Sequence, residues 1–308
     1  MKDSDKALRI NSESKNTQYH PELKLSSNIF ASEKLEEIIP QSEIIFVATP
    51  SKIINDVLDR LTDFSIDNKM IISCTKGINE NPFMTMSEAI EKHFNNSSIK
   101  VGVLSGPNLA KEIADEKVAG TVIASKHADL CHQAREILSS STFKIYTSDD
   151  IKGIELAGAL KNIYAIISGY CHSLDVGENA IGLILTRSMA EMSNFAVNKG
   201  ANPITFLGLA GMGDLVATCF SKLSRNYQFG WAIGEGLDIE AAKYKVGQVA
   251  EGLNTIRIIH NEISSSKIKM PLVSGMHEIL FNSGSKELLL EQIINSDIYV
   301  DVNFDVES

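Results

Sequence analysis

Lys161 has the surroundings of a lysine that could exchange a proton with a bound substrate. It lies in the run from Gly153 to Arg187, among small and apolar residues. Small neighbours let other helices approach closely and exclude water, and taking an ammonium out of water lowers its pKa toward neutral pH. The alternative interpretation, a lysine exposed on an amphipathic helix, is the more common one for any single lysine.

Lysine, glycine and asparagine also occur in turns that follow predicted strands. Lys76 lies in one such turn, and Gly106 and Asn108 lie in another. In open α/β sheets, ligands bind beyond the carboxyl ends of the strands. An ammonium at that place suits a phosphate or a developing alkoxide, and the rigid Gly-Pro turn at 106–107 exposes backbone N–H groups to an anion. For Lys76 alone, a solvated turn lysine is an equally good interpretation.

Two further groups of polar residues lie in the second half of the chain. Asp214 follows a glycine-rich turn that begins at Gly208, where the backbone can come close to a ligand. On its own, capping of a helix N-terminus is the more common role for such an aspartate. Ser224, Arg225 and Asn226 can bind phosphate, because arginine offers paired donors and a helix start adds backbone N–H groups.

The composition excludes several classes of function. The chain has 308 residues, 44% of them hydrophobic and 22% charged, as in a soluble globular protein of one or two domains. A net charge of -10 argues against nucleic acid as the main partner. Four widely spaced cysteines without a CxxC pair predict reduced thiols in a cytoplasmic protein. We expect no metal site, no GxSxG hydrolase and no membrane span, since no apolar run approaches about 18 residues.

Strands and helices are predicted to alternate in the first half of the chain, which indicates a mostly parallel, doubly wound sheet. The first forty residues are polar and predict irregular structure, with a short extended segment at 23–29 and a brief helix at 33–39. A further helix is predicted after a turn and N-cap at 49–51, with its apolar face between Ile53 and Leu61. Another is predicted from Pro82 to Phe94, and one between the last two strands. Continuous apolar runs predict strands at 43–48, 69–74, 100–105, 120–125 and 143–147.

The strand signal disappears at about residue 150, which predicts a domain boundary there. An α/β domain over 1–149 is then followed by an all-helical domain over 150–308. The acidic tail at 298–308 is expected to be frayed. Helices are predicted at 151–172, 177–199, 203–208, 212–219, 224–235, 238–243, 249–264 and 271–282.

Taken together, these segments resemble the NAD(P)-dependent glycerol-3-phosphate dehydrogenases of the bacterial type. The matching blocks cover nearly the whole chain, and their order and spacing are specific. The resemblance implies a Rossmann-like dinucleotide-binding domain over 1–149 and a substrate domain of the 6-phosphogluconate dehydrogenase-like type over 150–308. It also implies a cytoplasmic homodimer. The blocks are 47–51, 75–77, 105–112, 153–162, 177–180, 186–192, 208–219, 224–226 and 251–252.

The activity implied by the resemblance is the interconversion of dihydroxyacetone phosphate and sn-glycerol 3-phosphate with NADPH or NADH, which supplies phospholipid synthesis. Lys161 matches the family's proton donor and acceptor at the substrate C2 oxygen. Lys76 matches a second lysine shared by cofactor and substrate, and Asp214 matches a substrate-site acid that orients Lys161 and binds a substrate hydroxyl. The other implied substrate residues are Gly106, Asn108, Ser224, Arg225 and Asn226, and the implied cofactor residues are Lys76, Ala110, Arg225, Val249 and Glu251.

Two departures from the family pattern concern Asn108 and the N-terminus. Asn108 stands where the family usually has serine or threonine, and we expect a modest effect. A dinucleotide-binding domain should open with a strand and G-x-G-x-x-G, but the first glycine here is Gly77. We therefore expect an N-terminally truncated sheet that lacks one βαβ unit of roughly 30 residues. Residues 44–47 would then lie at a bare apolar sheet edge.

Two alternative functions remain, the first suggested by the departure at the N-terminus and the second by the shared two-domain plan. One is a catalytically impaired remnant that acts at most as a phosphate-binding or dimerising helical domain. The other is a related dehydrogenase that acts on a hydroxy acid. The block at 224–226 and the glycine-rich turn before Asp214 favour the phosphorylated triose as substrate.

Overall fold

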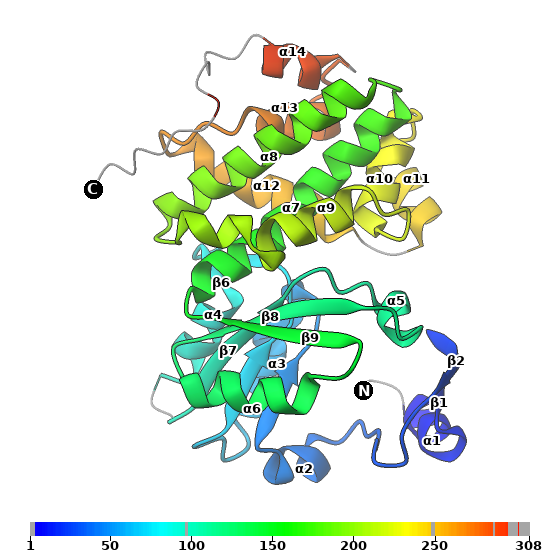
Figure 1. Ribbon diagram of the computed structural model, residues 1–308, viewed down its shortest axis with the longest axis vertical. Coiled ribbons are helices and arrows are strands. Elements are labelled where there is room, and N and C mark those ends of the chain that lie inside the picture. Colours follow the sequence, from blue (N-terminus) through cyan, green and yellow to red (C-terminus); the bar gives the residue numbers. More distant parts are fainter. Residues whose placement is uncertain (1–3, 96–97, 248–249, 286, 295–300, 302–308) are drawn as a thin grey trace. The chain divides into compact units, whose positions relative to one another are not determined.

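The computed structural model describes residues 4–95, 98–247, 250–285, 287–294 and 301 (Figure 1). The chain divides into two compact units. The α/β unit comprises 1–75, 86–104 and 108–149, and the helical unit comprises 76–85, 105–107 and 150–308. Two short segments that follow strands of the α/β unit, 76–85 and 105–107, thus belong to the helical unit.

The α/β unit is built on a five-stranded sheet with the order β3-β4-β7-β8-β9. Strand pairs β3–β4, β4–β7 and β8–β9 are parallel, with Ile45 opposite Ile71 and Ile71 opposite Val101. All five predicted strands are confirmed, within one residue at each end. Their bounds are β3 Ile44–Val47, β4 Met70–Ser73, β7 Lys100–Ser105, β8 Ala119–Ser125 and β9 Phe143–Ser148.

Both faces of this sheet are covered, which explains why its strands are continuously apolar. Ile71 packs into one buried cluster, whereas its neighbours Met70 and Ile72 pack into another. Successive side chains of a strand point to opposite faces, so the two clusters lie on the two sides of the sheet. The helices of this unit are α1 Ser4–Glu13, α2 Leu35–Ile38, α3 Ile54–Leu61, α4 Met86–His93, α5 Ala110–Ala114 and α6 Ala128–Leu138.

Strand β3 ends the sheet in the described part of the chain, as predicted. It pairs with β4 on one side. Ile44 and Ile45 are half-buried, and Phe46 is 38% exposed. The edge of the sheet is therefore apolar.

Two predictions near the N-terminus and around Pro82 are wrong. Residues 4–13 form helix α1, followed by the strands β1 Lys15–Asn16 and β2 His20–Lys24, where irregular structure was expected. Helix α4 begins at Met86 rather than at Pro82, because residues 78–85 form a hairpin. Its strands are β5 Ile78–Asn79 and β6 Met84–Thr85.

The helical unit is organised around the long helix α7 (Ile151–Ser173), whose residues are almost all buried. Helices α8, α9, α10, α12 and α13 all contact α7. The predicted helices are confirmed with small shifts of their ends, except that 203–207 is a 3-10 helix and 209–213 a π-helix. The other bounds are α8 Glu178–Asn198, α9 Asp214–Cys219, α10 Arg225–Gly234, α11 Ile239–Val246, α12 Glu251–Ser264, α13 Pro271–Phe281 and α14 Leu288–Ile294.

Glycines allow α7 and α10 to touch backbone to backbone. A Cβ on Gly169 would lie 2.0 Å from the carbonyl oxygen of Tyr227, and one on Gly230 would lie 1.9 Å from that of Ile166. Such distances leave no room for a side chain at either position. Glycine is therefore required for the backbones of α7 and α10 to lie in contact. No helix in the described ranges is long and apolar enough to cross a membrane.

Candidate active site

The start of α7 is held by one carboxylate. Asp150 Oδ1 accepts a hydrogen bond from the backbone N–H of Gly153 at 2.9 Å. Its other oxygen accepts from the N–H of Asn202 at 3.0 Å and from Thr205 Oγ1 at 2.6 Å. This N-cap therefore ties the helix that carries Lys161 to the segment that leads into the glycine-rich turn.

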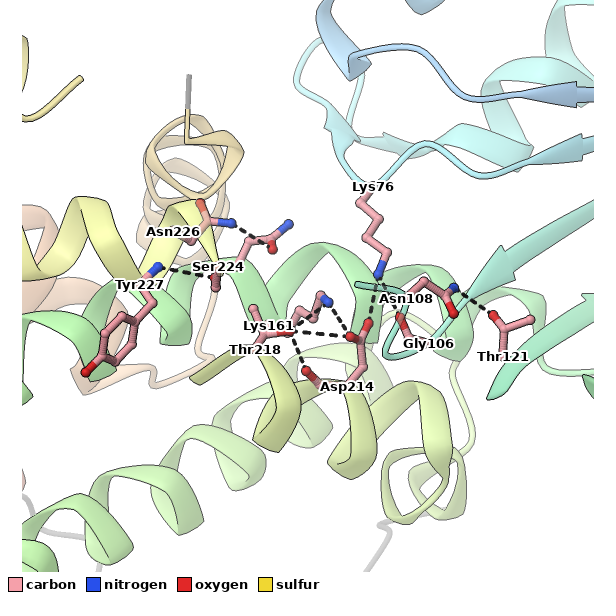
Figure 2. Close-up of polar contacts among 11 residues, drawn as sticks. Lys76, Gly106, Asn108, Thr121, Lys161, Asp214, Thr218, Ser224, Asn226 and Tyr227 are labelled. Atoms are coloured by element: carbon pink, nitrogen blue, oxygen red, sulfur yellow. Dashed lines mark hydrogen bonds and ion pairs between the residues drawn. The ribbon is translucent and has the colours of Figure 1, made fainter. Parts of the chain in front are cut away.

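Lys161 is buried in the helical unit, with 6% of its surface exposed. Its Nζ donates to Asp214 Oδ1 and, at 2.8 Å, to Thr218 Oγ1. The interpretation of an exposed lysine is wrong, because α9 packs over this face of α7 and supplies both acceptors. Figure 2 shows the side chain directed at Asp214.

Asp214 binds a second lysine through its other oxygen. Lys76 Nζ donates to Asp214 Oδ2 at 2.8 Å and to the carbonyl oxygen of Gly106 at 3.1 Å (Figure 2). The solvated-turn interpretation of Lys76 is therefore wrong. The capping interpretation of Asp214 is also wrong, because this fully buried side chain lies in the first turn of α9 and binds the two ammonium groups instead.

The charges in this cluster do not balance. Lys76 and Lys161 carry two positive charges when both are protonated, and Asp214 supplies one negative charge. An unpaired positive charge in a buried site is costly, and it favours an incoming anion or the loss of a proton. Asp214 thus leaves the site one negative charge short, which suits a developing alkoxide.

The pKa of Lys161 reflects this imbalance. Desolvation by burial, together with the positive charge of Lys76, lowers the pKa of Lys161 to about 7, while the carboxylate of Asp214 opposes the shift. A group with this pKa populates both protonation states near neutral pH. It can therefore serve as proton donor in one direction of a reaction and as acceptor in the other.

The predicted phosphate residues lie at the start of α10. Ser224 caps the helix, its Oγ accepting from the N–H of Tyr227 at 3.3 Å, and Arg225 is exposed. Asn226 Nδ2 donates to Asn162 Oδ1 at 2.9 Å, and Asn226 Oδ1 accepts from the N–H of Gly252 at 3.0 Å. Asn226 therefore joins α10 to α7, next to Lys161, and to the start of α12.

Glu251 lies at the start of α12, within the electrostatic reach of this cluster. Burial raises its pKa, while the positive charges of Arg225 and Lys76 lower it. The structure therefore brings Glu251 into the same charged surroundings as Arg225 and Lys76. Val249, the other late cofactor residue, lies outside the described residues.

Asn108 and Ala110 belong to the α/β unit. Asn108 Nδ2 donates to Thr121 Oγ1 at 2.9 Å, and its Oδ1 is buried without a hydrogen-bond partner in the described part of the chain. Ala110 is exposed at the first residue of α5.

Thr218 was missed by the sequence interpretation. Its hydroxyl accepts from Lys161 and donates to the backbone oxygen of Asp214 at 2.6 Å. A threonine four positions after an aspartate lies on the same face of a helix, which is the signal that could have revealed it.

Sequence spacing also hid a group of potential metal ligands, because His260 comes from α12, whereas His277 and Glu278 come from α13.

Fold and site together define a class of protein. A sheet with parallel strand pairs, covered on both faces and followed by polar turns after β3, β4 and β7, is typical of nucleotide-binding domains. The helical unit adds a buried lysine–aspartate–lysine cluster that is suited to proton exchange with an oxygen. These features define a two-domain oxidoreductase of the Rossmann type.

Comparisons with known proteins agree with this class. The family models for the N-terminus and the C-terminus of NAD-dependent glycerol-3-phosphate dehydrogenase match residues 1–131 and 150–291. Glycerol-3-phosphate dehydrogenase [NAD(P)+] of Alcanivorax borkumensis is 43% identical over 304 residues, which is 99% of this chain and 88% of that protein. The corresponding protein of Pseudomonas syringae is also 43% identical over 304 residues, 99% of this chain and 88% of that protein. The chain belongs to the NAD-dependent glycerol-3-phosphate dehydrogenase family.

Solved structures show the same fold. A glycerol-3-phosphate dehydrogenase from Coxiella burnetii superposes with a TM-score of 0.89 at 30% identity, covering 95% of this chain and 89% of that one. One from Saccharomyces cerevisiae gives 0.83 at 25% identity, covering 94% and 86%. The expected fold class is confirmed.

The expectation that the opening unit of the cofactor domain is missing is not borne out. The N-terminal family model matches from residue 1 to residue 131. No glycine precedes Gly77 in the sequence, yet a glycine-rich turn is a small part of a domain that is defined mainly by its strands. Strands β3, β4, β7 and β8 all lie within the matched range.

Proposed function

We propose that this chain interconverts dihydroxyacetone phosphate and sn-glycerol 3-phosphate with NADPH or NADH. The observation that carries the proposal is the binding of Lys76 and Lys161 to the two oxygens of one buried carboxylate. Reduction of a ketone needs a proton donor and a positive environment at the carbonyl oxygen. Membership of the glycerol-3-phosphate dehydrogenase family supports the choice of substrate.

The α/β unit fits a dinucleotide at the carboxyl ends of its strands. Val47 of β3 is in register with Ser73 of β4. Ser73 Oγ and, just beyond β3, Thr49 Oγ1 are buried hydroxyls without a hydrogen-bond partner in the described ranges. Unpartnered polar groups at a sheet's carboxyl edge suit a polar ligand. Lys76, Ala110, Arg225, Val249 and Glu251 are the proposed cofactor residues.

Proton transfer is the task of Lys161. A nicotinamide held by the proposed cofactor residues would supply or accept the hydride. In reduction, the protonated Nζ of Lys161 donates its proton to the C2 oxygen, so that the product is a neutral alcohol and Lys161 becomes a neutral amine. In oxidation, the neutral amine takes the hydroxyl proton back. Asp214 orients Lys161 in both directions, because its carboxylate holds the Nζ.

Lys76 and the start of α10 bind the substrate in this proposal. Lys76 stabilises the negative charge that develops on the carbonyl oxygen. Ser224, Arg225 and Asn226 hold the phosphate, with Gly106 and Asn108 as further contacts. Phosphate binding away from C2 fixes the reacting group in place and so contributes to the rate.

Two alternatives are weaker. A catalytically impaired remnant, acting only as a phosphate-binding or dimerising domain, would have no need to keep an ion-paired lysine buried at a cost. A hydroxy-acid dehydrogenase would have no need of the block 224–226. The discriminating experiment is an assay of NADPH and NADH oxidation with dihydroxyacetone phosphate, pyruvate and oxaloacetate in turn. Oxidation with the phosphorylated triose alone supports the proposal, and no oxidation with any of them supports the remnant.

We further propose that the α/β unit, taken as residues 1–149, binds the dinucleotide and that residues 150–308 bind the substrate. The protein would act as a homodimer in the cytoplasm and supply glycerol 3-phosphate for phospholipids. Burial raises the pKa values of Cys171 and Cys219 to about 12, so both remain thiols, as suits a reducing compartment. Light scattering of the purified protein tests the dimer.

A further inference from the structure

Lys76 begins a segment, residues 76–85, whose contacts with the helices include some at the hairpin turn several residues away. Lys76 is followed by the β5–β6 hairpin, in which Ile78 pairs with Thr85 and Asn79 pairs with Met84. Residues 80–83 therefore form the turn at the far end. The whole segment from 76 to 85 belongs to the helical unit, although the strand before it belongs to the α/β unit.

Phe83 holds the far end of the hairpin. Its ring packs edge-on against the fully buried ring of Phe195 on α8, with 5.9 Å between the centroids. Lys199 Nζ lies 4.7 Å from the centre of the Phe83 ring and 5.7 Å from that of Phe195. A cation over an aromatic face is attracted to it, so Lys199 clamps both rings.

Lys199, which contacts both rings, is itself bound to α12. Lys199 forms an ion pair with Glu262, and the neighbouring Asn261 donates to Glu80 of the hairpin turn at 3.3 Å. At the near end, Ile78 is 4% exposed within the core of the helical unit. The turn of the hairpin is thus held by α8 and α12, and its first residue, Ile78, is buried in the core two residues after Lys76.

We propose that Phe83, clamped by Phe195 and Lys199, is a positioning residue that holds Lys76 against Asp214. The proposal rests on the function proposed above for Lys76. Phe83 itself touches neither Lys76 nor Asp214 in any contact of the described structure. Its effect would pass through the hairpin backbone on the C-terminal side of Lys76. On the N-terminal side, the chain is held by Thr75, whose hydroxyl donates to the carbonyl oxygen of Thr49 at 2.8 Å.

Displacement of Lys76 should change the pKa of Lys161, which a general loss of stability would not do. The groups that act on Lys161 are Lys76 from the turn before the hairpin, and Asp214, Thr218 and Cys219 from α9. Among these groups, Lys76 is the positive neighbour that lowers the pKa of Lys161. Withdrawal of Lys76 should therefore raise that pKa and move the pH dependence of catalysis upward.

The test compares Phe83→Ala, Phe83→Leu and a matched control. Phe281→Ala is the control, because Phe281 also packs on the core of the helical unit and has a cation, Arg257, 4.9 Å from its ring centre. We expect Phe83→Ala to lower kcat by about 10-fold or more, Phe83→Leu to lower it less, and Phe281→Ala to leave it near the wild-type value. The pH midpoint of kcat/KM should rise in Phe83→Ala alone.

A second readout does not depend on activity. Reductive methylation followed by peptide mass mapping measures how fast each lysine reacts. Lys76, held by Asp214, should react slowly in the wild type and in Phe281→Ala, and several-fold faster in Phe83→Ala. If the wild type lacks activity but Lys76 loses protection in Phe83→Ala, the proposed function fails and the positioning role stands. Unchanged protection of Lys76 in folded Phe83→Ala and Phe83→Leu would overturn the positioning role.

Discussion

Lys76 and Lys161 donate to opposite oxygens of the single carboxylate of Asp214, which is fully buried. The two lysines come from different parts of the chain, one from the turn before the β5–β6 hairpin and one from the middle of α7. Because one negative charge faces two positive ones, the site stabilises either an incoming anion or a neutral lysine. We therefore expect this relationship to determine the pH dependence of catalysis.

The pH dependence should differ in sign between the two directions of the reaction. The pKa of Lys161 is lowered to about 7 by burial and by Lys76. Ketone reduction needs the protonated form, so kcat/KM for reduction should fall as the pH rises through about 7. Alcohol oxidation needs the neutral amine, so kcat/KM for oxidation should rise over the same range. Steady-state kinetics in both directions at constant ionic strength check this, and profiles that move in the same direction would contradict it.

Thr218→Val should shift the same profiles downward. Valine keeps the shape of threonine but removes the hydroxyl that accepts from Lys161. An ammonium that loses an acceptor is less stable, so the pKa of Lys161 should fall. A buried donor without a partner costs about 1–3 kcal/mol, and the free energy of unfolding should decrease by a similar amount. Thr186→Val, which removes an exposed hydroxyl bonded within α8, is the control and should change neither quantity.

Arg225→Met should weaken binding of the phosphate group in particular. Hydrogen bonds to charged groups contribute about 1.5–3 kcal/mol, so KM for dihydroxyacetone phosphate should rise on the order of 10- to 100-fold. Dihydroxyacetone, which lacks the phosphate, should be used equally poorly by both proteins. A parallel loss with both substrates would place Arg225 outside the phosphate site. Arg257→Met, on α12, serves as the control.

Glu191 predicts a pH-dependent stability that is separate from catalysis. It is buried between α7 and α13, where its oxygens accept from Tyr164 Oη at 3.0 Å and from the N–H of Leu272 at 2.7 Å. Burial raises its pKa from 4.5 to about 8, against the opposing effect of these hydrogen bonds and of Arg187. The native state therefore holds a proton that the unfolded chain releases above pH 4.5.

The stability that Glu191 contributes should be fully present below pH 4.5 and lost as the pH rises through about 8. Glu191→Gln keeps the shape and the neutral state, so the mutant should lose less unfolding free energy between pH 5 and 8, by an amount on the order of a few kcal/mol. Urea denaturation at several pH values measures the difference. Glu136→Gln, at an exposed position, should follow the wild type. Parallel curves for Glu191→Gln and the wild type would show that Glu191 is charged in the folded protein.

The elements that could be predicted from the sequence are those with a strong local pattern. Strands β3 and β4 are short, continuously apolar runs, and α7 is a long, largely apolar run without proline, so local sequence identifies them. Helix α1 escaped prediction because only Ala7 and Ile10 are buried along it. The start of α4 was misplaced because the β5–β6 hairpin is stabilised by contacts of Phe83 with α8, which the local sequence does not contain.

The site residues show the same limit. Lys161, Lys76 and Asp214 could be named as candidates, but their residue types alone favoured an exposed lysine and a capping aspartate. Their ion pairs join residues 53 and 138 positions apart in the sequence, so spacing could not reveal them. Burial decided the outcome, because a buried ammonium and a buried carboxylate are costly alone and stabilise each other as a pair.

We propose above that Lys161 exchanges a proton with the C2 oxygen of a phosphorylated triose. The most direct measurement is oxidation of NADPH or NADH with dihydroxyacetone phosphate by the wild type and by Lys161→Met, with circular dichroism of both to confirm folding. We predict turnover by the wild type and a loss of about 100-fold or more in kcat for the folded mutant. Equal turnover by the two folded proteins, or no turnover by the wild type with either cofactor, would contradict the account.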